Sequence, residues 1–213
     1  MNYQIYTLYV NRRDLLMGTL DSIDAFQDRV VVLDDSPRQY LLIEDFAGEI
    51  YRPDVPLFCS PSYNLILALA RQRRQDAFFI MHSDARASAE VVEAVLARAE
   101  ELNQAGLRWG VIFTNYDVLC LQNTAVLAHF QWDPYLPVYY TDVDYYRRLR
   151  LAGIALIETG LPVEHAERGS SAMKADAALY HFVQTNFPAW REYYHRKWGG
   201  ERDQERFATP FDT

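Results

Sequence analysis

The chain has few cysteines and no long apolar run, and both features narrow its class. Its two cysteines, Cys59 and Cys120, lie far apart in 213 residues and show no metal-ligand spacing, so we expect buried or free thiols in a reducing compartment. No uninterrupted apolar stretch is long enough to span a bilayer. Asn2, Gln4 and Arg12–Arg13 interrupt the N-terminal apolar residues, so no signal peptide is expected. These features predict a soluble, cytoplasmic protein without a transmembrane segment.

The motifs of several common enzyme classes are also missing. The sequence contains no Walker-type loop, no Gly-x-Gly-x-x-Gly, no Gly-x-Ser-x-Gly elbow and no Cys/His dyad spacing. Interpretations as a kinase, dehydrogenase, hydrolase or thiol protease therefore lose their main support. Basic residues are outnumbered, with 21 Lys and Arg against 29 Asp and Glu and a formal charge of −8. This charge argues against bulk electrostatic binding of nucleic acid but leaves a local basic pocket open.

Hydrophobic residues are abundant and their pattern predicts an α/β fold. They make up 50% of the chain, enough for a sizeable core, and the length fits one domain with room for a second. A strand, a helix and a strand over the first 33 residues match the size of a βαβ unit. Strands are expected at 4–10, 29–33, 77–81, 107–113 and 154–159, with weaker candidates at 40–43 and 48–51. Helices are expected at 15–26, 63–74, 87–104, 141–153 and 175–194, with loops at 54–62 and 132–138 and an ambiguous segment at 118–130.

The most informative stretch joins an apolar run to polar side chains. Ala77 to Met81 are apolar and lead directly into His82, Ser83 and Asp84. Such a run is typical of a strand buried on both faces in a parallel sheet, and ligands bind beyond the carboxyl ends of these strands. Alternate residues of a strand share a face, so His82 and Asp84 are candidates to bind one cation if the strand geometry continues to Asp84. The alternative is that Asp84 caps the helix that begins near residue 88.

Carboxylates follow other apolar or aromatic runs as well. Asp34 and Asp35 follow the second strand, and Asp142 and Asp144 begin a helix after several tyrosines. Several carboxylates at the strand ends of one sheet indicate an acidic cleft for a divalent cation that carries a phosphate ligand. Alternatively, each carboxylate caps its own helix or solvates its own turn.

His165 and a group of aromatic residues each allow two interpretations. His165 follows the last predicted strand; it is a surface or core residue unless the fold brings it to Asp84, where histidine and carboxylate together suit Mn²⁺. The aromatic residues of 131–150 offer flat faces for stacking on a sugar or base, whereas a core role is the simpler interpretation for most of them. They are Trp132, Tyr139, Tyr140, Tyr145 and Tyr146.

In this order and spacing, the motifs resemble GT-A-type glycosyltransferases of the large family 2 kind. The closer resemblance is to a bacterial and phage subgroup with a Met-His-x-Asp-Ala centre, an Asp-x-Asp-Tyr-Tyr-x-Arg helix start and a Lys-Trp-Gly-Gly end. It covers nearly the whole chain. The matching segments are Tyr9-Val10-Asn11-Arg12, Val31-Val32-Leu33-Asp34-Asp35-Ser36, Met81-His82-Ser83-Asp84-Ala85, Trp132-Asp133, Thr141-Asp142-Val143-Asp144 and Lys197-Trp198-Gly199-Gly200.

The resemblance implies a fold and an activity. The fold is a single-domain GT-A, Rossmann-like α/β fold with a mostly parallel central sheet flanked by helices. Residues 1–170 form the catalytic domain and 171–213 a C-terminal helical extension packed on it, with a seam near 169–174. The activity is metal-dependent, inverting transfer of a sugar, of the hexosyltransferase kind, from a nucleotide-diphosphate donor to an acceptor hydroxyl, as in polysaccharide biosynthesis. A glycan is one such acceptor; no nucleic-acid partner is implied, and peripheral membrane association stays open.

The resemblance also assigns roles to residues. It implies that Asp84, with His82 and His165, binds Mn²⁺ or Mg²⁺ and that Asp142 is the catalytic base. The nucleotide sugar is expected to contact Tyr9, Asn11, Asp34, Asp35, Asn64, Ser83, Asp84 and Lys197. For Lys197, closure over the diphosphate and a simple surface role are both open. Residues 198–200 are expected to form a turn that folds the tail over the cleft.

Two positions depart from the family pattern and define the alternatives. His82 stands where the family has the first Asp of Asp-x-Asp, and Thr141 replaces the Glu beside the proposed base. These substitutions support a second hypothesis, a non-catalytic sugar-nucleotide-binding module of the same fold. A nucleotidyltransferase is a third hypothesis, but it would need a glycine-rich loop after the first strand, and Asn11-Arg12-Arg13 has no glycine.

Overall fold

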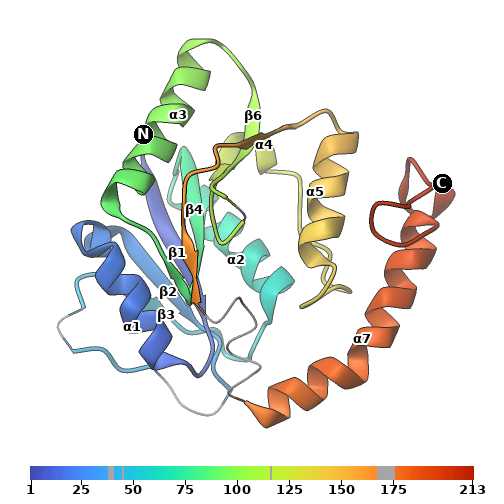
Figure 1. The fold of residues 1–213 in the computed structure, drawn as a ribbon, viewed down its shortest axis with the longest axis horizontal. Helices are drawn as coiled ribbons and strands as arrows, with labels where there is room; N and C mark the ends of the chain where they lie inside the picture. The colour runs from blue at the N-terminus through green and yellow to red at the C-terminus, as the bar shows by residue number, and fades with distance from the viewer. Residues whose placement is uncertain (38–40, 45, 116, 167–175) are drawn as a thin grey trace.

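The computed structural model describes residues 1–37, 41–44, 46–115, 117–166 and 176–213. A seven-stranded sheet forms its centre, in the order β3-β2-β1-β4-β7-β6-β8 (Figure 1). Neighbouring strands are parallel except β7, which is antiparallel to both β4 and β6. The strands are β1 (Tyr3–Tyr9), β2 (Val30–Asp34), β3 (Glu49–Tyr51), β4 (Ala77–His82), β6 (Trp109–Phe113), β7 (Leu119–Asn123) and β8 (Ala155–Glu158).

Helices cover both faces of this sheet because successive strand residues point to opposite sides. Ile5 packs with α1 (Arg13–Ser22) and α3 (Ala89–Gln104) on one face, whereas Tyr6 packs with α2 (Cys59–Gln72), α4 (Thr124–Leu127) and α5 (Thr141–Leu151) on the other. All of β2 and the first five residues of β4 are buried, as their continuous apolar runs predict. A 3-10 helix, η1 (Asp24–Arg29), joins α1 to β2, so the helix expected over 15–26 ends earlier than predicted.

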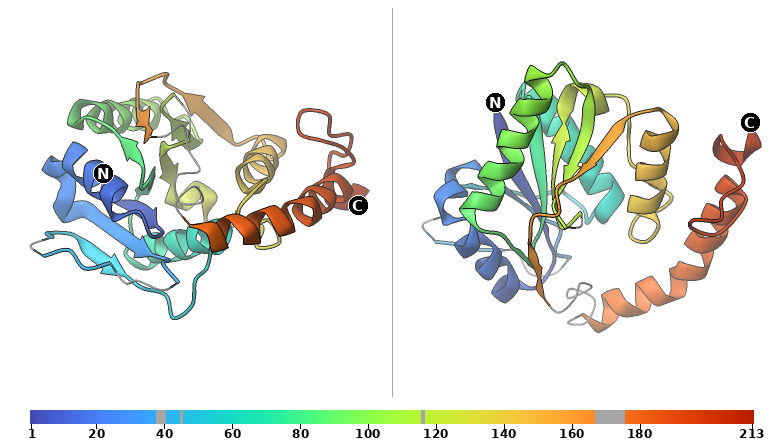
Figure 2. Two further views of the ribbon diagram at one scale, coloured as in Figure 1. Left: turned by 60° about the horizontal axis from the view of Figure 1, so that its bottom comes forward. Right: turned by 45° about the horizontal axis from the view of Figure 1, so that its top comes forward.

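The long helix α7 (Ala177–Trp198) lies along one side of the molecule, beside α5 (Figure 2). Its apolar side chains, including Val183, Trp190 and Tyr194, pack around Leu136 of the irregular segment before α5. Asp176 caps its first turn by accepting hydrogen bonds from two backbone amides. Gly199 ends it in a left-handed conformation with φ of 73°, where a side chain would collide with Phe207. A last 3-10 helix, η3 (Pro210–Asp212), follows.

Several local predictions differ from the structure. Residues 41–43 form no strand, and α2 begins at Cys59, inside the segment expected to be a loop. The ambiguous segment 118–130 divides into β7 and α4. α5 begins at Thr141, as predicted, and its N-cap is Tyr140, in a left-handed conformation. The hydroxyl of Thr141 bonds to Ser60 of α2. The expected seam at 169–174 lies outside the described residues, so the division at residue 170 stays a prediction.

None of the helices described here is both long and apolar enough to cross a membrane.

Candidate functional site

Two short strands bring a distant histidine to the end of β4. β5 (Ala85–Arg86) pairs antiparallel with β9 (Glu164–His165), and the backbone amide of Ala166 donates a 2.8 Å hydrogen bond to the carbonyl of Asp84. As a result, Nε2 of His165 lies 3.1 Å from Oδ1 of Asp84. Asp84 does not cap the following helix, because the N-cap of α3 is Ser88, beyond β5. The capping alternative is therefore wrong.

The side chains of His82, Asp84 and His165 form a cluster that fits a divalent cation. One ligand atom from each lies within 4.8 Å of the others. Ligands bound to one ion at about 2.1 Å are at most about 4.2 Å apart, so a small side-chain adjustment would complete the site. Burial lowers the pKa of His82, against the opposing effect of Asp84 and Asp142, and so favours the neutral imidazole that binds metals. Two imidazoles and one carboxylate suit an ion such as Mn²⁺.

This cluster lines a cavity of about 770 Å³ at the carboxyl ends of the strands. The volume lies within the usual range for small-molecule sites, and the position is the one expected for an open α/β sheet. Asp35, Ser83, Thr141 and Asp142 line the same cavity, together with apolar side chains of α7. Of the residues predicted for the site, the cavity wall therefore includes His82, Ser83, Asp84, Asp35, Asp142 and His165. Tyr9, Asn11, Asp34, Asn64 and Lys197 are not part of it.

Four of the five aromatic residues near α5 line the cavity, and Trp132, Tyr145 and Tyr146 belong to the buried core. Stacking on a sugar or base stays a prediction. Trp132, Tyr139, Tyr140 and Tyr146 line the cavity. Tyr145 is fully buried and stacks on Trp132 with a centroid distance of 3.9 Å, so it belongs to the core. Its stacking fixes the plane of Trp132, and the side chain of Asn64 bonds both the amide and the carbonyl of Trp132 at 2.7 and 2.9 Å. Asn64 thus orients a wall residue.

Asp34 and Asp35 hold the chain that follows β2 against the sheet. Asp34 accepts hydrogen bonds from the amide of Leu41 and from Nε of Arg52, at 2.7 and 3.2 Å. Asp35 accepts them from the amides of Leu57 and Phe58 at 2.6 and 2.8 Å. Burial raises the pKa of Asp35 to about 6 in spite of these bonds, with the negative charge of Asp34 adding to the effect. Asp35 is thus a cavity carboxyl whose charge changes near neutral pH.

Asn11 and Tyr9 occupy supporting positions after β1. The amide of Asn11 donates to Oγ of Ser36, and its side chain donates a 2.7 Å hydrogen bond to Asp176, the cap of α7. Tyr9 is buried in the core beneath them. These contacts fix the first turn of α7 against the end of β1, so the cavity wall that α7 provides is anchored at its N-terminal end.

Lys197 is buried, and the alternative of a surface role is wrong. Its Nζ lies 2.5 Å from Oδ2 of Asp133 and 2.6 Å from Oδ1 of Asp144. Asp144 is fully buried and also accepts hydrogen bonds from Nε1 of Trp198 and Nε of Arg148. The Lys-Trp-Gly-Gly motif thus ties the C-terminal end of α7 to α5, two residues from Asp142.

Replacing Lys197 with methionine should lower the free energy of unfolding by about 3–5 kcal/mol, because Asp133 and Asp144 would lose their shared cation in a buried setting. Urea unfolding measures the change. The neighbouring Arg196→Met is the matched control, since Arg196 pairs with Glu192 at the surface and should contribute less than about 1 kcal/mol. Equal losses of unfolding free energy in the two variants would contradict a stabilising role for the buried ion pairs of Lys197.

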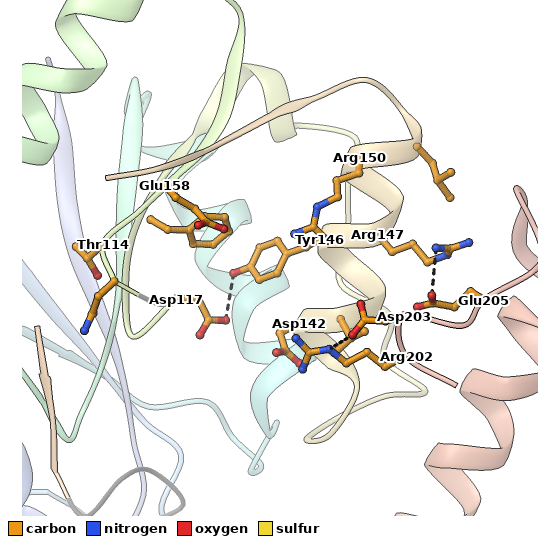
Figure 3. A pocket seen from close by; sticks show the side chains of 14 residues that line it. Thr114, Asp117, Asp142, Tyr146, Arg147, Arg150, Glu158, Arg202, Asp203 and Glu205 are labelled. Carbon is orange, nitrogen blue, oxygen red and sulfur yellow. Dashed lines mark hydrogen bonds and ion pairs between the residues drawn. The ribbon is translucent and has the colours of Figure 1, made fainter. Parts of the chain in front are cut away.

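The sequence analysis missed Asp117, which lies between β6 and β7 and lines the cavity beside Asp142. Its Oδ2 accepts a 3.4 Å hydrogen bond from the hydroxyl of Tyr146 (Figure 3). Burial, followed by the charge of Asp142, raises the pKa of Asp117 to about 7. The available signal is its place shortly after a buried strand, and the same rule points to Asp84.

Replacing Asp117 with asparagine should stabilise the metal-free protein at pH 8. Because the folded pKa is about 7 and the unfolded one about 3.9, the folded state binds more protons between these values, and the free energy of unfolding falls as the pH rises. Asparagine does not titrate, so Asp117→Asn does not lose stability in this way as the pH rises. The difference in free energy of unfolding between Asp117→Asn and wild type should therefore grow from pH 4 to pH 8 by up to about 4 kcal/mol in favour of the variant. Urea unfolding across this range tests it; an advantage that is independent of pH would contradict it.

No family profile and no curated protein sequence matches the chain. Solved structures are similar in fold. S. aureus TarS residues 1–349 matches with a TM-score of 0.58 at 14% identity, covering 75% of this chain and 58% of that one. GalNAc-T7, solved with UDP, GalNAc and Mn²⁺, matches with a TM-score of 0.61 at 10% identity, covering 92% of this chain and 50% of that one. A cytidylyltransferase from Leptospira borgpetersenii serovar Hardjo-bovis matches with a TM-score of 0.56 at 12% identity, covering 89% of this chain and 96% of that one.

These similarities establish the fold. The mostly parallel sheet flanked by helices is the GT-A fold of nucleotide-diphospho-sugar transferases, and the fold expected from the sequence is confirmed. The chain spans 58% of the TarS fragment and half of GalNAc-T7.

Proposed function

We infer that the chain is a glycosyltransferase that moves a sugar from a nucleotide diphosphate to an acceptor hydroxyl. The observation that carries the proposal is the convergence of His82, Asp84, His165 and Asp142 in one cavity at the strand ends of a GT-A sheet. Related folds supply further support: GalNAc-T7 was solved with UDP, GalNAc and Mn²⁺, and TarS with UDP and with UDP-GlcNAc.

His82, Asp84 and His165 would hold a divalent cation, Mn²⁺ or Mg²⁺. When bound, such an ion supplies a Lewis acid that offsets the charge growing on the diphosphate leaving group. Asp35 and Ser83 line the same cavity and are the protein groups that would contact the nucleotide sugar. Tyr9, Asn11, Asp34, Asn64 and Lys197 would support binding indirectly, through the internal contacts that shape the cavity wall.

Asp142 is the proposed base. Its carboxylate would take the proton from the acceptor hydroxyl as that oxygen attacks the anomeric carbon, while the bond to the diphosphate breaks on the opposite side of the carbon. One such displacement inverts the anomeric configuration. Thr141 cannot add a second carboxylate here; its hydroxyl bonds to Ser60, which also donates a 2.7 Å hydrogen bond to the carbonyl of Leu136. This contact would hold the start of α5, and with it Asp142, in place.

Calorimetric titration with UDP, GDP, TDP and CDP, each with and without Mn²⁺, tests the proposal. We expect one nucleotide to bind in a metal-dependent way, and its sugar conjugate to release that nucleotide during turnover. Binding without transfer or hydrolysis would favour the non-catalytic module instead. Absence of binding by all four nucleotides, with and without metal, would refute the proposed function.

A further inference from the structure

A second cavity, of about 400 Å³, is drawn in Figure 3. It shares part of its wall with the first cavity. Asp117, Asp142, Val143, Tyr146 and Arg202 line both cavities. The candidate metal ligands line only the larger one. If Asp142 is the base, as in the proposed function on which this inference rests, the two substrates must meet at its carboxylate. The larger cavity takes the donor, and the smaller one is then placed to take the acceptor.

The walls of the smaller cavity come from four parts of the chain, one of which is the end of β6 with the residues after it, Phe113, Thr114, Asn115 and Asp117. Tyr146, Arg147 and Arg150 project from α5, and Glu158 lies at the end of β8. Arg202, Asp203 and Glu205 come from the segment that follows α7, on the opposite side in Figure 3. The C-terminal segment therefore contributes directly to this cavity, in addition to packing on α5.

Acidic groups outnumber basic groups on these walls. Arg147 pairs with Glu205 at 3.5 Å and donates a 2.8 Å hydrogen bond to the carbonyl of Phe207, and Arg202 pairs with Asp203 at 3.4 Å. The other charged lining residues are Asp117, Asp142, Glu158 and Arg150, and of these Asp117 accepts a hydrogen bond from the hydroxyl of Tyr146. Carboxylates accept hydrogen bonds from hydroxyl groups, and they repel phosphate and carboxylate groups.

Apolar surface completes the cavity. The ring of Tyr146 meets that of Phe113 edge to face, with centroids 4.9 Å apart, and Val143 and Leu151 lie in the same wall. Hydrogen-bond acceptors beside aromatic and aliphatic surface match the alternating polar edges and apolar faces of a sugar ring. The volume is near the lower end of the range for small-molecule sites, which limits the occupant to a short chain end.

We propose that the smaller cavity binds the acceptor and that this acceptor is the end of a neutral saccharide, without phosphate or carboxylate groups. Glu158, at the far side of the cavity from the C-terminal segment, is assigned as a specificity residue that accepts hydrogen bonds from acceptor hydroxyls and disfavours anions. It belongs to neither the candidate metal cluster nor the donor cavity.

The test uses the full chain loaded with Mn²⁺ and the nucleoside diphosphate found by calorimetry. Ligand-observed NMR compares maltose, cellobiose, lactose and chitobiose with glucose 6-phosphate and glucuronic acid. At least one neutral disaccharide should bind, and the anionic sugars should bind at least tenfold more weakly. Glu158→Lys should weaken neutral binding at least tenfold while nucleotide affinity stays unchanged. Glu100→Lys, an exposed substitution on α3, is the matched control and should change neither.

Each other outcome overturns the inference in a recognisable way. If the nucleotide binds but anionic sugars bind as tightly as neutral ones, or none of the disaccharides binds, the acceptor assignment fails and the proposed function survives. Unchanged saccharide binding in Glu158→Lys would remove Glu158 from the site. Saccharide binding by a protein that binds no nucleotide would overturn both the acceptor role and the proposed function.

Discussion

Replacing Asp142 with asparagine should lower the rate of sugar transfer by about a hundred- to ten-thousandfold, the usual contribution of a general base, while leaving nucleotide affinity unchanged. Asparagine has nearly the same shape as aspartate but cannot take the proton of the acceptor hydroxyl. Asp142 lies in the first turn of α5 and lines both cavities, yet it is outside the candidate metal cluster. Nucleotide release during turnover measures the rate, and calorimetry measures the affinity.

Asp144→Asn is the comparison variant that distinguishes a loss of catalytic rate from a loss of stability. Asp144 is on the same helix and is fully buried, and it pairs with Lys197 and Arg148. Its replacement should lower the free energy of unfolding, because the buried Lys197 and the partly buried Arg148 would each lose a charged partner. Asp142→Asn should unfold at nearly the same urea concentration as wild type. If Asp142→Asn retains more than half of the wild-type rate, the base lies elsewhere, and Asp117 is the other carboxyl that lines both cavities.

The sequence predicted those strands whose burial follows from a short continuous run of apolar residues. β2 and β4 are continuous apolar runs, and both are buried on two faces as expected. The direction of β7 could not be predicted in this way, because pairing with β4 and β6 depends on the whole sheet. The same limit explains why the segment 118–130 was ambiguous: it contains both a strand and a helix.

The candidate site follows the same division. The apolar run predicted where His82 and Asp84 lie, but β4 ends at His82 and Asp84 lies in the following turn, so the two side chains do not meet by strand alternation. His165 joins them only through the β5–β9 pairing, across about 80 residues of sequence. Lys197 was expected either at the diphosphate or at the surface because a lysine is seldom buried without a partner. Its partners, Asp133 and Asp144, come from other segments and become neighbours only in the folded chain.

Replacing Asp84 with asparagine should remove the metal-dependent part of nucleotide binding, an expected loss of at least about a hundredfold in affinity in the presence of Mn²⁺. Asp84 is the only carboxylate in the cluster with His82 and His165, so its replacement leaves neutral ligands alone to balance the charge of a divalent ion. Calorimetry with and without Mn²⁺ measures the effect, using the nucleotide that wild type prefers.

Matched substitutions outside the cavity show whether this loss belongs to the cluster. Asp21→Asn changes an exposed carboxylate on α1, and His129→Ala an exposed histidine; both should bind nucleotide as wild type does. His165→Ala should weaken binding less than Asp84→Asn, because it removes a neutral ligand and leaves the carboxylate in place. If Asp84→Asn keeps metal-dependent binding at wild-type strength, the ion is held elsewhere, and the close approach of Asp84 to His165 is a structural hydrogen bond that fastens β9 to the end of β4.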